Sequence, residues 1–205
     1  MSRIVILCEG DTEELAVRHF IARQWKSDGF GSVGLKPINL DGKLQNVGKF
    51  ANLSLDEQDV VAVFSLVDLQ GMTRVVHPSQ DNLETMIQRV RKWLSAQVNR
   101  ARAAQFFPHV CVHQTEAWIL AEGCALVTRL RDPGIEPDPN AEIKNFANPP
   151  SKRLNELFLR YKKRRYSKIT DGTPLFTWMR FVPVYDSCRY FHAFYDDLKA
   201  AGGSK

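Results

Sequence analysis

Three runs of aliphatic and β-branched residues divide the first part of the chain. They lie at residues 4–7 (IVIL), 60–67 (VVAVFSLV) and 107–112 (FPHVCV). Apolar runs with little polar alternation are typical of strands buried on both faces of a parallel sheet. Helical spacing of apolar residues separates them, from Thr12 to Trp25 and from Asn82 to Val98. This order predicts an α/β fold with a mainly parallel sheet flanked by helices.

A glycine-rich segment at residues 29–34 has the spacing G-x-G-x-x-G. In a dinucleotide-binding loop this spacing follows a strand and opens a helix. Here it follows a helical pattern and leads into an extended stretch, residues 35–40, that contains Pro37. We therefore interpret the segment as a turn before an edge strand, where proline is tolerated, and exclude a nucleotide cofactor.

The second half of the chain is less regular. Residues 123–149 contain Asp-Pro-Gly and Pro-Asp-Pro, which indicate loops. Helical spacing resumes after Ser151 and again over 186–200. We expect residues 1–122 to form the α/β core. Residues 123–205 should form a loop-rich insertion and a basic, helical C-terminal extension packed on the same domain.

Composition changes this picture little. The chain has 205 residues, of which 44% are hydrophobic and 25% charged, as in ordinary globular proteins. No apolar run approaches the roughly 20 residues of a membrane span, and the polar, acidic start is not a signal peptide. The four cysteines form no CxxC pair, so we expect a cytoplasmic protein with reduced thiols. A net charge of +5 permits binding to a polyanion.

An acidic residue follows each of the three apolar runs: Glu9, Asp68 and Glu116. The carboxyl ends of parallel strands meet at one edge of a sheet, where ligands bind in open α/β folds. We expect the three carboxylates to converge there. The alternative is that Glu9 is a solvated loop acid and that Glu13 and Glu14 only favour the dipole of the following helix.

Three carboxylates gathered at one edge repel each other unless a cation neutralises them. Oxygen ligands without nitrogen or sulfur suit Mg²⁺ or Mn²⁺. Such ions keep open positions for water and phosphate oxygens, which points to phosphodiester chemistry. Glu9, Asp68 and Glu116 are the candidate metal ligands, and Glu13 would be an outer ligand or the base that activates water.

The most basic segment of the chain follows the helical pattern after Ser151. It contains four consecutive cations, Lys162, Lys163, Arg164 and Arg165, with Tyr161 and Tyr166 at either end. Basic residues beside aromatic rings suit phosphate contact and base stacking. The alternative is a solvated helix end whose lysines favour the dipole. Lys152 and Lys168 are candidates to contact the scissile phosphate and stabilise its charge in the transition state.

Several motifs together resemble a known family, DUF4276. They are Cys8-Glu9-Gly10-x-Thr12-Glu13, the strand ending in Asp68, Phe107-Pro108-His109-x-x-x-His113-x-x-Glu116-Ala117, Pro150-Ser151-Lys152-Arg153-Leu154 and a later Tyr-x-Lys. That family is related to Toprim domains, including those of OLD-type and RloB-like nucleases. The resemblance implies a Toprim-like (Rossmann-like) sheet and Mg²⁺-dependent chemistry on DNA or RNA. It also implies an ABC- or SMC-like ATPase partner in a prokaryotic anti-phage defence system.

Two positions depart from the pattern of Toprim enzymes. Gln70 stands where their Asp-x-Asp pair has its second acid, and Gln114 leaves Glu116 as the acid of the third motif. The sequence thus predicts a metal-dependent endonuclease or phosphodiesterase. One alternative is a degenerate Toprim-like module that binds nucleic acid or a partner without cutting. The other is a phosphoryl-transfer enzyme acting on nucleotides.

Overall fold

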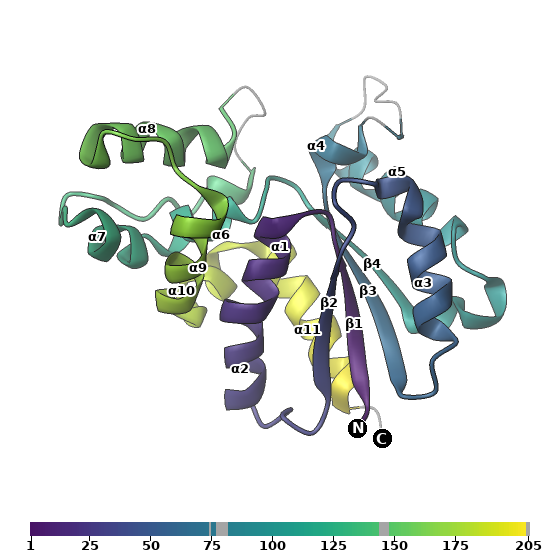
Figure 1. Cartoon of the computed structure of the whole chain (residues 1–205). Coiled ribbons are helices and arrows are strands. Elements are labelled where there is room, and N and C mark those ends of the chain that lie inside the picture. Colours follow the sequence, from purple (N-terminus) through teal and green to yellow (C-terminus); the bar gives the residue numbers. More distant parts are fainter. Residues whose placement is uncertain (74, 77–81, 144–147, 204–205) are drawn as a thin grey trace.

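The computed structural model describes residues 1–73, 75–76, 82–143 and 148–203. These residues contain four strands: β1 (Arg3–Cys8), β2 (Gly34–Asn39), β3 (Val60–Asp68) and β4 (Phe106–Cys111). All of the pairings are parallel and the strand order is β2-β1-β3-β4. The predicted parallel sheet flanked by helices, with a helical C-terminal extension, is confirmed (Figure 1).

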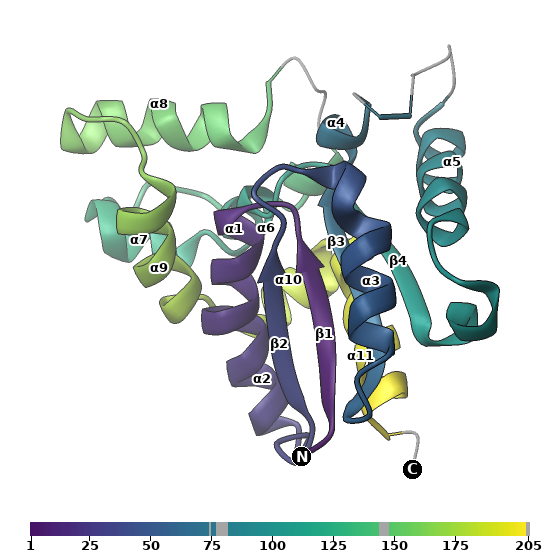
Figure 2. The ribbon, with the colours of Figure 1, turned by 45° about the vertical axis from the view of Figure 1, so that its right-hand side comes forward.

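Helices cover both faces of the sheet, as Figures 1 and 2 show. Alternate residues of β1 face opposite sides, so Ile4 and Ile6 join one core cluster while Val5 and Leu7 join the other. The first face packs on α1 (Asp11–Leu15), the π-helical turn η1 (Ala16–Ile21), α2 (Ala22–Ser27) and α11 (Arg189–Gly203). The second face packs on α3 (Val47–Leu55) and α5 (Leu83–Ala96). Burial on both faces explains the unbroken apolar runs.

The remaining elements connect and extend this sandwich. They are η2 (Leu44–Asn46), α4 (Leu69–Met72), η3 (Arg100–Gln105), α6 (Glu116–Glu122), α7 (Cys124–Leu130), η4 (Ala141–Ile143), α8 (Pro150–Lys162), α9 (Lys168–Trp178) and α10 (Phe181–Ser187). α6 follows β4, and α7 to α10 lie on the side of α1 (Figure 1). The division at residue 122 stays a prediction. Within the described residues, no helix is both long and apolar enough to span a membrane.

The edge strand and its preceding turn agree with the prediction. β2 pairs with β1 alone, and Pro37 lies opposite Ile6 in that register. Residues 29–33 form the turn between α2 and β2, and Gly34 is the first residue of β2; Gly29 has a φ of 89°. Since the segment precedes a strand and opens no helix, it lacks the geometry of a phosphate-binding loop.

The N-terminal cap of α1 is Gly10, whose N–H donates to Glu13 Oε2 at 3.1 Å. Two local predictions were wrong. The segment expected to be loop-rich contains the helix α7 before its turns begin. The C-terminal helix is divided into α10 and α11 at Cys188, whose backbone is extended and whose side chain is fully buried. The bend lets Phe181 pack edge-on against Phe191, with 5.6 Å between ring centroids.

Candidate acidic site at the carboxyl edge of the sheet

The three predicted acids lie at the carboxyl edge of the sheet. Glu9 follows β1, Asp68 ends β3, and Glu116 is the first residue of α6 after β4. Glu116 is fully buried, Asp68 is 8% exposed and Glu9 is partly buried. The parallel topology alone brings these ends together.

Glu9 and Asp68 are joined through the backbone. The N–H of Asp68 donates to Glu9 Oε2 at 2.8 Å, and the N–H of Gln70 donates to Asp68 Oδ1 at 3.0 Å. The second bond caps α4. A Cβ on Gly71 would lie 2.3 Å from Glu9 Oε1. Glycine is therefore needed at this position for the Glu9 carboxylate to lie against α4.

Two hydroxyl groups link the start of α1 to the start of α6. The Thr115 hydroxyl donates to Glu13 Oε1 at 3.2 Å, and the Thr12 hydroxyl donates to Glu116 Oε1 at 3.4 Å. Both threonines are fully buried. Thr12, which precedes Glu13, thus bonds Glu116. Thr115, which precedes Glu116, bonds Glu13. This role of the threonines was not predicted from the sequence, although the repeated Thr-Glu dipeptide is a visible signal for it.

A single lysine approaches this pair of acids in the described part of the chain. Lys168 Nζ lies 3.9 Å from Glu116 Oε1, and the lysine side chain is 54% exposed. The other carboxylate oxygen of Glu116 is buried and has no hydrogen-bond partner among the described residues. The Tyr166 hydroxyl is likewise buried without a partner there. Glu116 Oε2 and the Tyr166 hydroxyl are thus buried polar atoms of the site that lack a hydrogen bond from the described residues.

Glu13, Asp68 and Glu116 hold their protons more tightly than isolated carboxyl groups do. Burial raises the pKa of Glu13 from 4.5 to about 8; the charges of Glu116 and Glu9 add to the shift, and Lys168 opposes it. Burial likewise raises the pKa of Asp68 to about 7, with contributions from Glu9 and Glu116. The pKa of Glu116 is also raised by burial, and the ammonium of Lys168 works against that shift. The positive charge of Lys168 is therefore not enough to stabilise all of these carboxylates in their ionised form.

The donors have the chemistry of a Mg²⁺ or Mn²⁺ site, because all of them are carboxylate oxygens. The unsatisfied oxygen of Glu116 fits such an ion as well. Across the described residues, however, no three His, Cys, Asp or Glu side chains are placed so that they could hold one ion. Glu9 and Asp68 instead bond the backbone N–H groups of Asp68 and Gln70. The metal-ligand role of Glu9, Asp68 and Glu116 stays a prediction.

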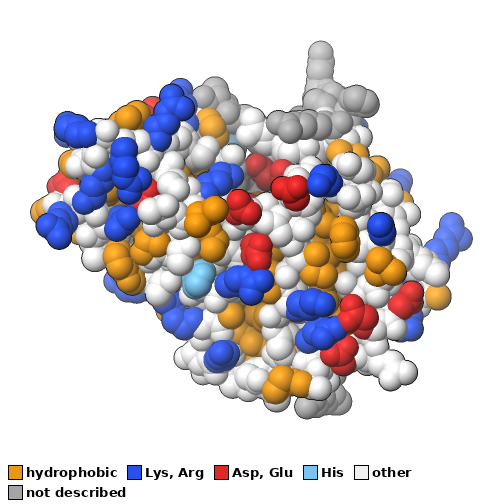
Figure 3. Space-filling view, viewed as in Figure 1, with side chains coloured by type: hydrophobic (Ala, Val, Ile, Leu, Met, Phe, Trp, Pro, Cys, Tyr) orange, Lys and Arg blue, Asp and Glu red, His pale blue; other side chains and the backbone are white. Residues whose placement is uncertain are grey.

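The predicted basic residues are all exposed, but one of them also has a structural contact. Lys152 lies in the first turn of α8, Lys162 is its last residue, and Lys163 and Arg165 follow it. Arg164, whose side chain is 44% exposed, forms an ion pair with the buried carboxylate of Asp171, 2.6 Å apart. In Figure 3, Lys and Arg side chains gather over α7 to α9, and acidic side chains gather near the middle of the same face. The nucleic-acid contacts stay a prediction.

The two glutamines differ in their surroundings. Gln70 is exposed at the start of α4. Gln114 Oε1 accepts a hydrogen bond from the Ser151 N–H at 3.3 Å, which ties β4 and its exit to the start of α8. Gln114 therefore has a structural contact at the position where the resemblance led us to expect an acid.

Comparison with solved structures finds the C-terminal region of the Burkholderia pseudomallei OLD protein, with 13% sequence identity and a TM-score of 0.44. The alignment covers 95% of this chain and 99% of that one. No curated protein sequence matches the chain. The family model described as "Domain of unknown function (DUF4276)" matches residues 8–199, which include every candidate site residue named above. The chain belongs to the DUF4276 family.

Proposed function

We propose that the chain is a metal-dependent nuclease that hydrolyses phosphodiester bonds in DNA or RNA. Glu9, Asp68 and Glu116 would hold Mg²⁺ or Mn²⁺ at the carboxyl edge of the sheet. The family resemblance supports a role as the effector subunit of a prokaryotic defence system that works with an ATPase partner.

The observation that carries this proposal is the group of buried, mutually repelling acids at the ends of parallel strands. Burial raises the pKa of Glu13 to about 8 and that of Asp68 to about 7. A fold gains nothing in stability from such a group, because apolar residues of similar size would remove the penalty. Such a group can instead serve to bind a ligand of opposite charge. Carboxylate oxygens bind divalent ions such as Mg²⁺, which often also coordinate a substrate phosphate.

The residues around the acids have distinct parts in this proposal. A bound divalent ion would supply positive charge to the phosphate and to the attacking water. Glu13, which accepts hydrogen bonds from Gly10 and Thr115, would accept the proton of that water. Lys168, beside Glu116, would contact the phosphate oxygens, and the exposed Lys152 would contact them from the start of α8.

The polymer would extend over the basic surface of α8 and the segment after it. Lys162, Lys163 and Arg165 are exposed there and would bind phosphates of the strand. Arg164 contributes less to this surface, because Asp171 already holds its guanidinium group.

Cleavage assays with the ATPase partner, ATP and either Mg²⁺ or Mn²⁺ test the proposal on DNA and RNA. Asp68→Ala should abolish cleavage and leave the fold intact. Asp56→Ala removes an exposed acid at the end of α3 and is the matched control. Cleavage that survives Asp68→Ala contradicts the proposal, as does its absence under all of these conditions.

A second candidate is a degenerate module that binds nucleic acid or the partner without cutting it. The observation in its favour is Gln114, whose side-chain oxygen holds the N-terminus of α8 through Ser151. A neutral amide also binds a divalent ion less strongly than a carboxylate does. Salt-dependent binding of nucleic acid, unchanged by Asp68→Ala and without cleavage, would favour this module.

A further inference from the structure

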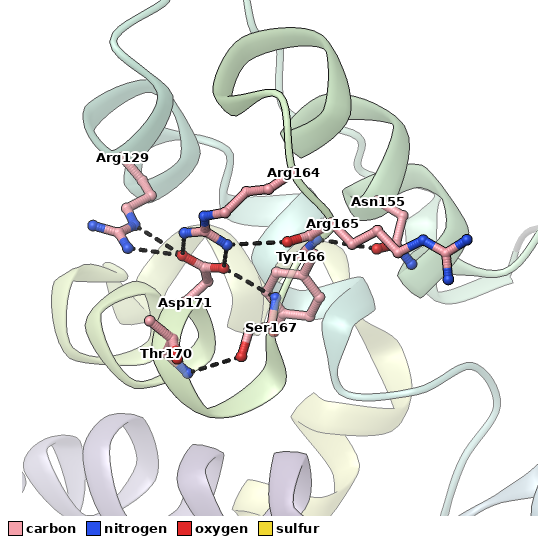
Figure 4. Close-up of polar contacts among 8 residues, drawn as sticks. All are labelled: Arg129, Asn155, Arg164, Arg165, Tyr166, Ser167, Thr170 and Asp171. Atoms are coloured by element: carbon pink, nitrogen blue, oxygen red, sulfur yellow. Dashed lines mark hydrogen bonds and ion pairs between the residues drawn. The ribbon is translucent and has the colours of Figure 1, made fainter.

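A polar cluster is centred on Asp171 of α9 (Figure 4). Lys168, three residues before Asp171 on the same helix, approaches Glu116 of the acidic site. The Asp171 carboxylate is fully buried. Arg164 donates to both of its oxygens, at 2.6 and 2.7 Å, and Arg129 of α7 donates to Oδ1 at 2.7 Å. The N–H of Ser167 donates to Oδ2 at 2.9 Å. One carboxylate thus connects α7, the end of α8 and α9.

The charge state of Asp171 follows from these donors. Burial alone raises the pKa of Asp171, but the hydrogen bonds from Arg164, Arg129 and the Ser167 N–H more than offset it. The net pKa lies below the ordinary value, so the group is ionised at neutral pH. Bidentate contacts between guanidinium and carboxylate groups are among the strongest hydrogen bonds in proteins. Asp171 therefore holds Arg129 of α7 and the residues Arg164 and Ser167 in fixed positions relative to α9.

The short segment from Arg164 to Lys168 leads from α8 into α9 and is bonded to Asp171 through Arg164 and Ser167. The chain reverses at Lys163, whose φ is 58°. The N–H of Tyr166 then donates to Asn155 Oδ1 at 3.1 Å, and the Ser167 N–H donates to Asp171. The backbone is thus anchored at two consecutive residues, on α8 and on α9.

The segment carries two polar groups towards the acids. Lys168 directly follows the anchored Ser167, and its Nζ lies 3.9 Å from Glu116 Oε1. Tyr166 directly precedes Ser167, and its hydroxyl is buried without a partner among the described residues. A Cβ on Gly172 would lie 3.1 Å from that hydroxyl, so the phenol lies directly over α9.

We propose that Asp171 is a positioning residue of the acidic site. Held between Arg129 and Arg164, it fixes the Arg164–Lys168 segment so that the Lys168 ammonium stays beside Glu116. The consequence for cleavage rests on the proposed nuclease function, whereas the placement of the segment is a property of the protein without substrate or metal.

The rival explanation is that Asp171 only stabilises the fold. The chain offers a matched control in Glu122, which is also fully buried. Glu122 accepts from Arg180 Nε at 2.9 Å and from the Ala125 N–H at 2.7 Å. Glu122→Gln and Asp171→Asn each leave a buried amide beside a guanidinium group, but only Asp171 contacts the Arg164–Lys168 segment.

Hydrogen exchange of the substrate-free protein tests the placement directly. In Asp171→Asn the N–H groups of Tyr166 and Ser167 should exchange at least tenfold faster than in the wild type, whereas those of β1 should be unchanged. Glu122→Gln should leave the two N–H groups protected. Should Asp171→Asn fail to fold, Arg164→Gln loosens the same segment and keeps Asp171 paired with Arg129. Unchanged protection of Tyr166 and Ser167 would overturn the proposal.

A double-mutant cycle with Lys168→Met tests the consequence for catalysis. Asp171→Asn and Lys168→Met should each lower kcat by roughly 10- to 100-fold, the order expected from misplacing a group by about 1 Å. The double variant should be no slower than Lys168→Met alone, because the two changes remove one effect. The KM for nucleic acid should change little, and Glu122→Gln should preserve kcat. Multiplicative losses in kcat would overturn the proposal. If the wild type does not cleave, hydrogen exchange decides the positioning role, and the proposed function alone is lost.

Discussion

Replacing Glu13 with glutamine isolates the electrostatic cost of the acidic site. The Glu13 side chain is 6% exposed, with Oε2 accepting from the Gly10 N–H and Oε1 from the Thr115 hydroxyl. A glutamine can keep its amide oxygen on Gly10 and donate its NH₂ to Thr115, because a hydroxyl both donates and accepts. Glu13→Gln therefore removes the charge and leaves each of these partners bonded.

The size of the effect follows from the pKa. Burial and the neighbouring acids raise the pKa of Glu13 from 4.5 to about 8, and each unit corresponds to about 1.4 kcal/mol. The folded state holds this proton more tightly than the unfolded state does, so the free energy of unfolding falls as pH rises. The loss starts near pH 4.5 and is complete above pH 8. Between pH 5 and pH 9 it amounts to roughly 4 kcal/mol.

Urea unfolding at pH 5, 7 and 9, with a chelator present, measures this loss. Glu13→Gln should be close to the wild type at pH 5 and more stable by several kcal/mol at pH 9. Glu14→Gln is the matched control on the same helix, since Glu14 forms an ion pair with Arg18 at 2.7 Å and is 24% exposed. An equal pH dependence in the wild type and Glu13→Gln would refute this reasoning.

Three further changes probe other parts of the site. Asp68→Asn should stabilise the metal-free protein as pH rises from 3.8 towards about 7, because burial raises that pKa; melting temperatures check this. Gly71→Ala should displace the Glu9 carboxylate, which a Cβ would approach to 2.3 Å, and so weaken Mn²⁺ binding in calorimetry without loss of fold. Replacing residues 162–165 with glutamine should lower the slope of log K against log salt by about 2 for single strands. This value assumes three lost phosphate contacts, from Lys162, Lys163 and Arg165. Arg164 is left out because its guanidinium group is paired with Asp171.

The sequence predicts the sheet and its acidic edge because both depend on local pattern. A strand buried on both faces must be apolar throughout, and the first acid after it marks its end. β1 and β3 end at Cys8 and Asp68, as their apolar runs indicate. Parallel topology then places Glu9, Asp68 and Glu116 at one edge without further information.

The contacts within the site could not be predicted in this way, because they join residues far apart in the chain. Thr115 and Glu13 are separated by 102 positions, and Thr12 and Glu116 by 104. Glu13 was named from the sequence, but its bonds to the Gly10 N–H and the Thr115 hydroxyl were not. Arg164 appeared as one of four equivalent cations, and only the buried Asp171 distinguishes it.

Proton release on metal binding provides a test that needs neither substrate nor partner. Glu13 and Asp68, with pKa values of about 8 and 7, both carry protons to a large extent at pH 6.5. A divalent ion bound by this cluster must displace protons, so its affinity should rise between pH 6 and pH 8. Mn²⁺ titration calorimetry in two buffers with different ionisation enthalpies counts the protons, and we expect about one or more at pH 6.5. Glu13→Gln should reduce the number. Binding of Mn²⁺ with no proton release would place the ion away from these acids.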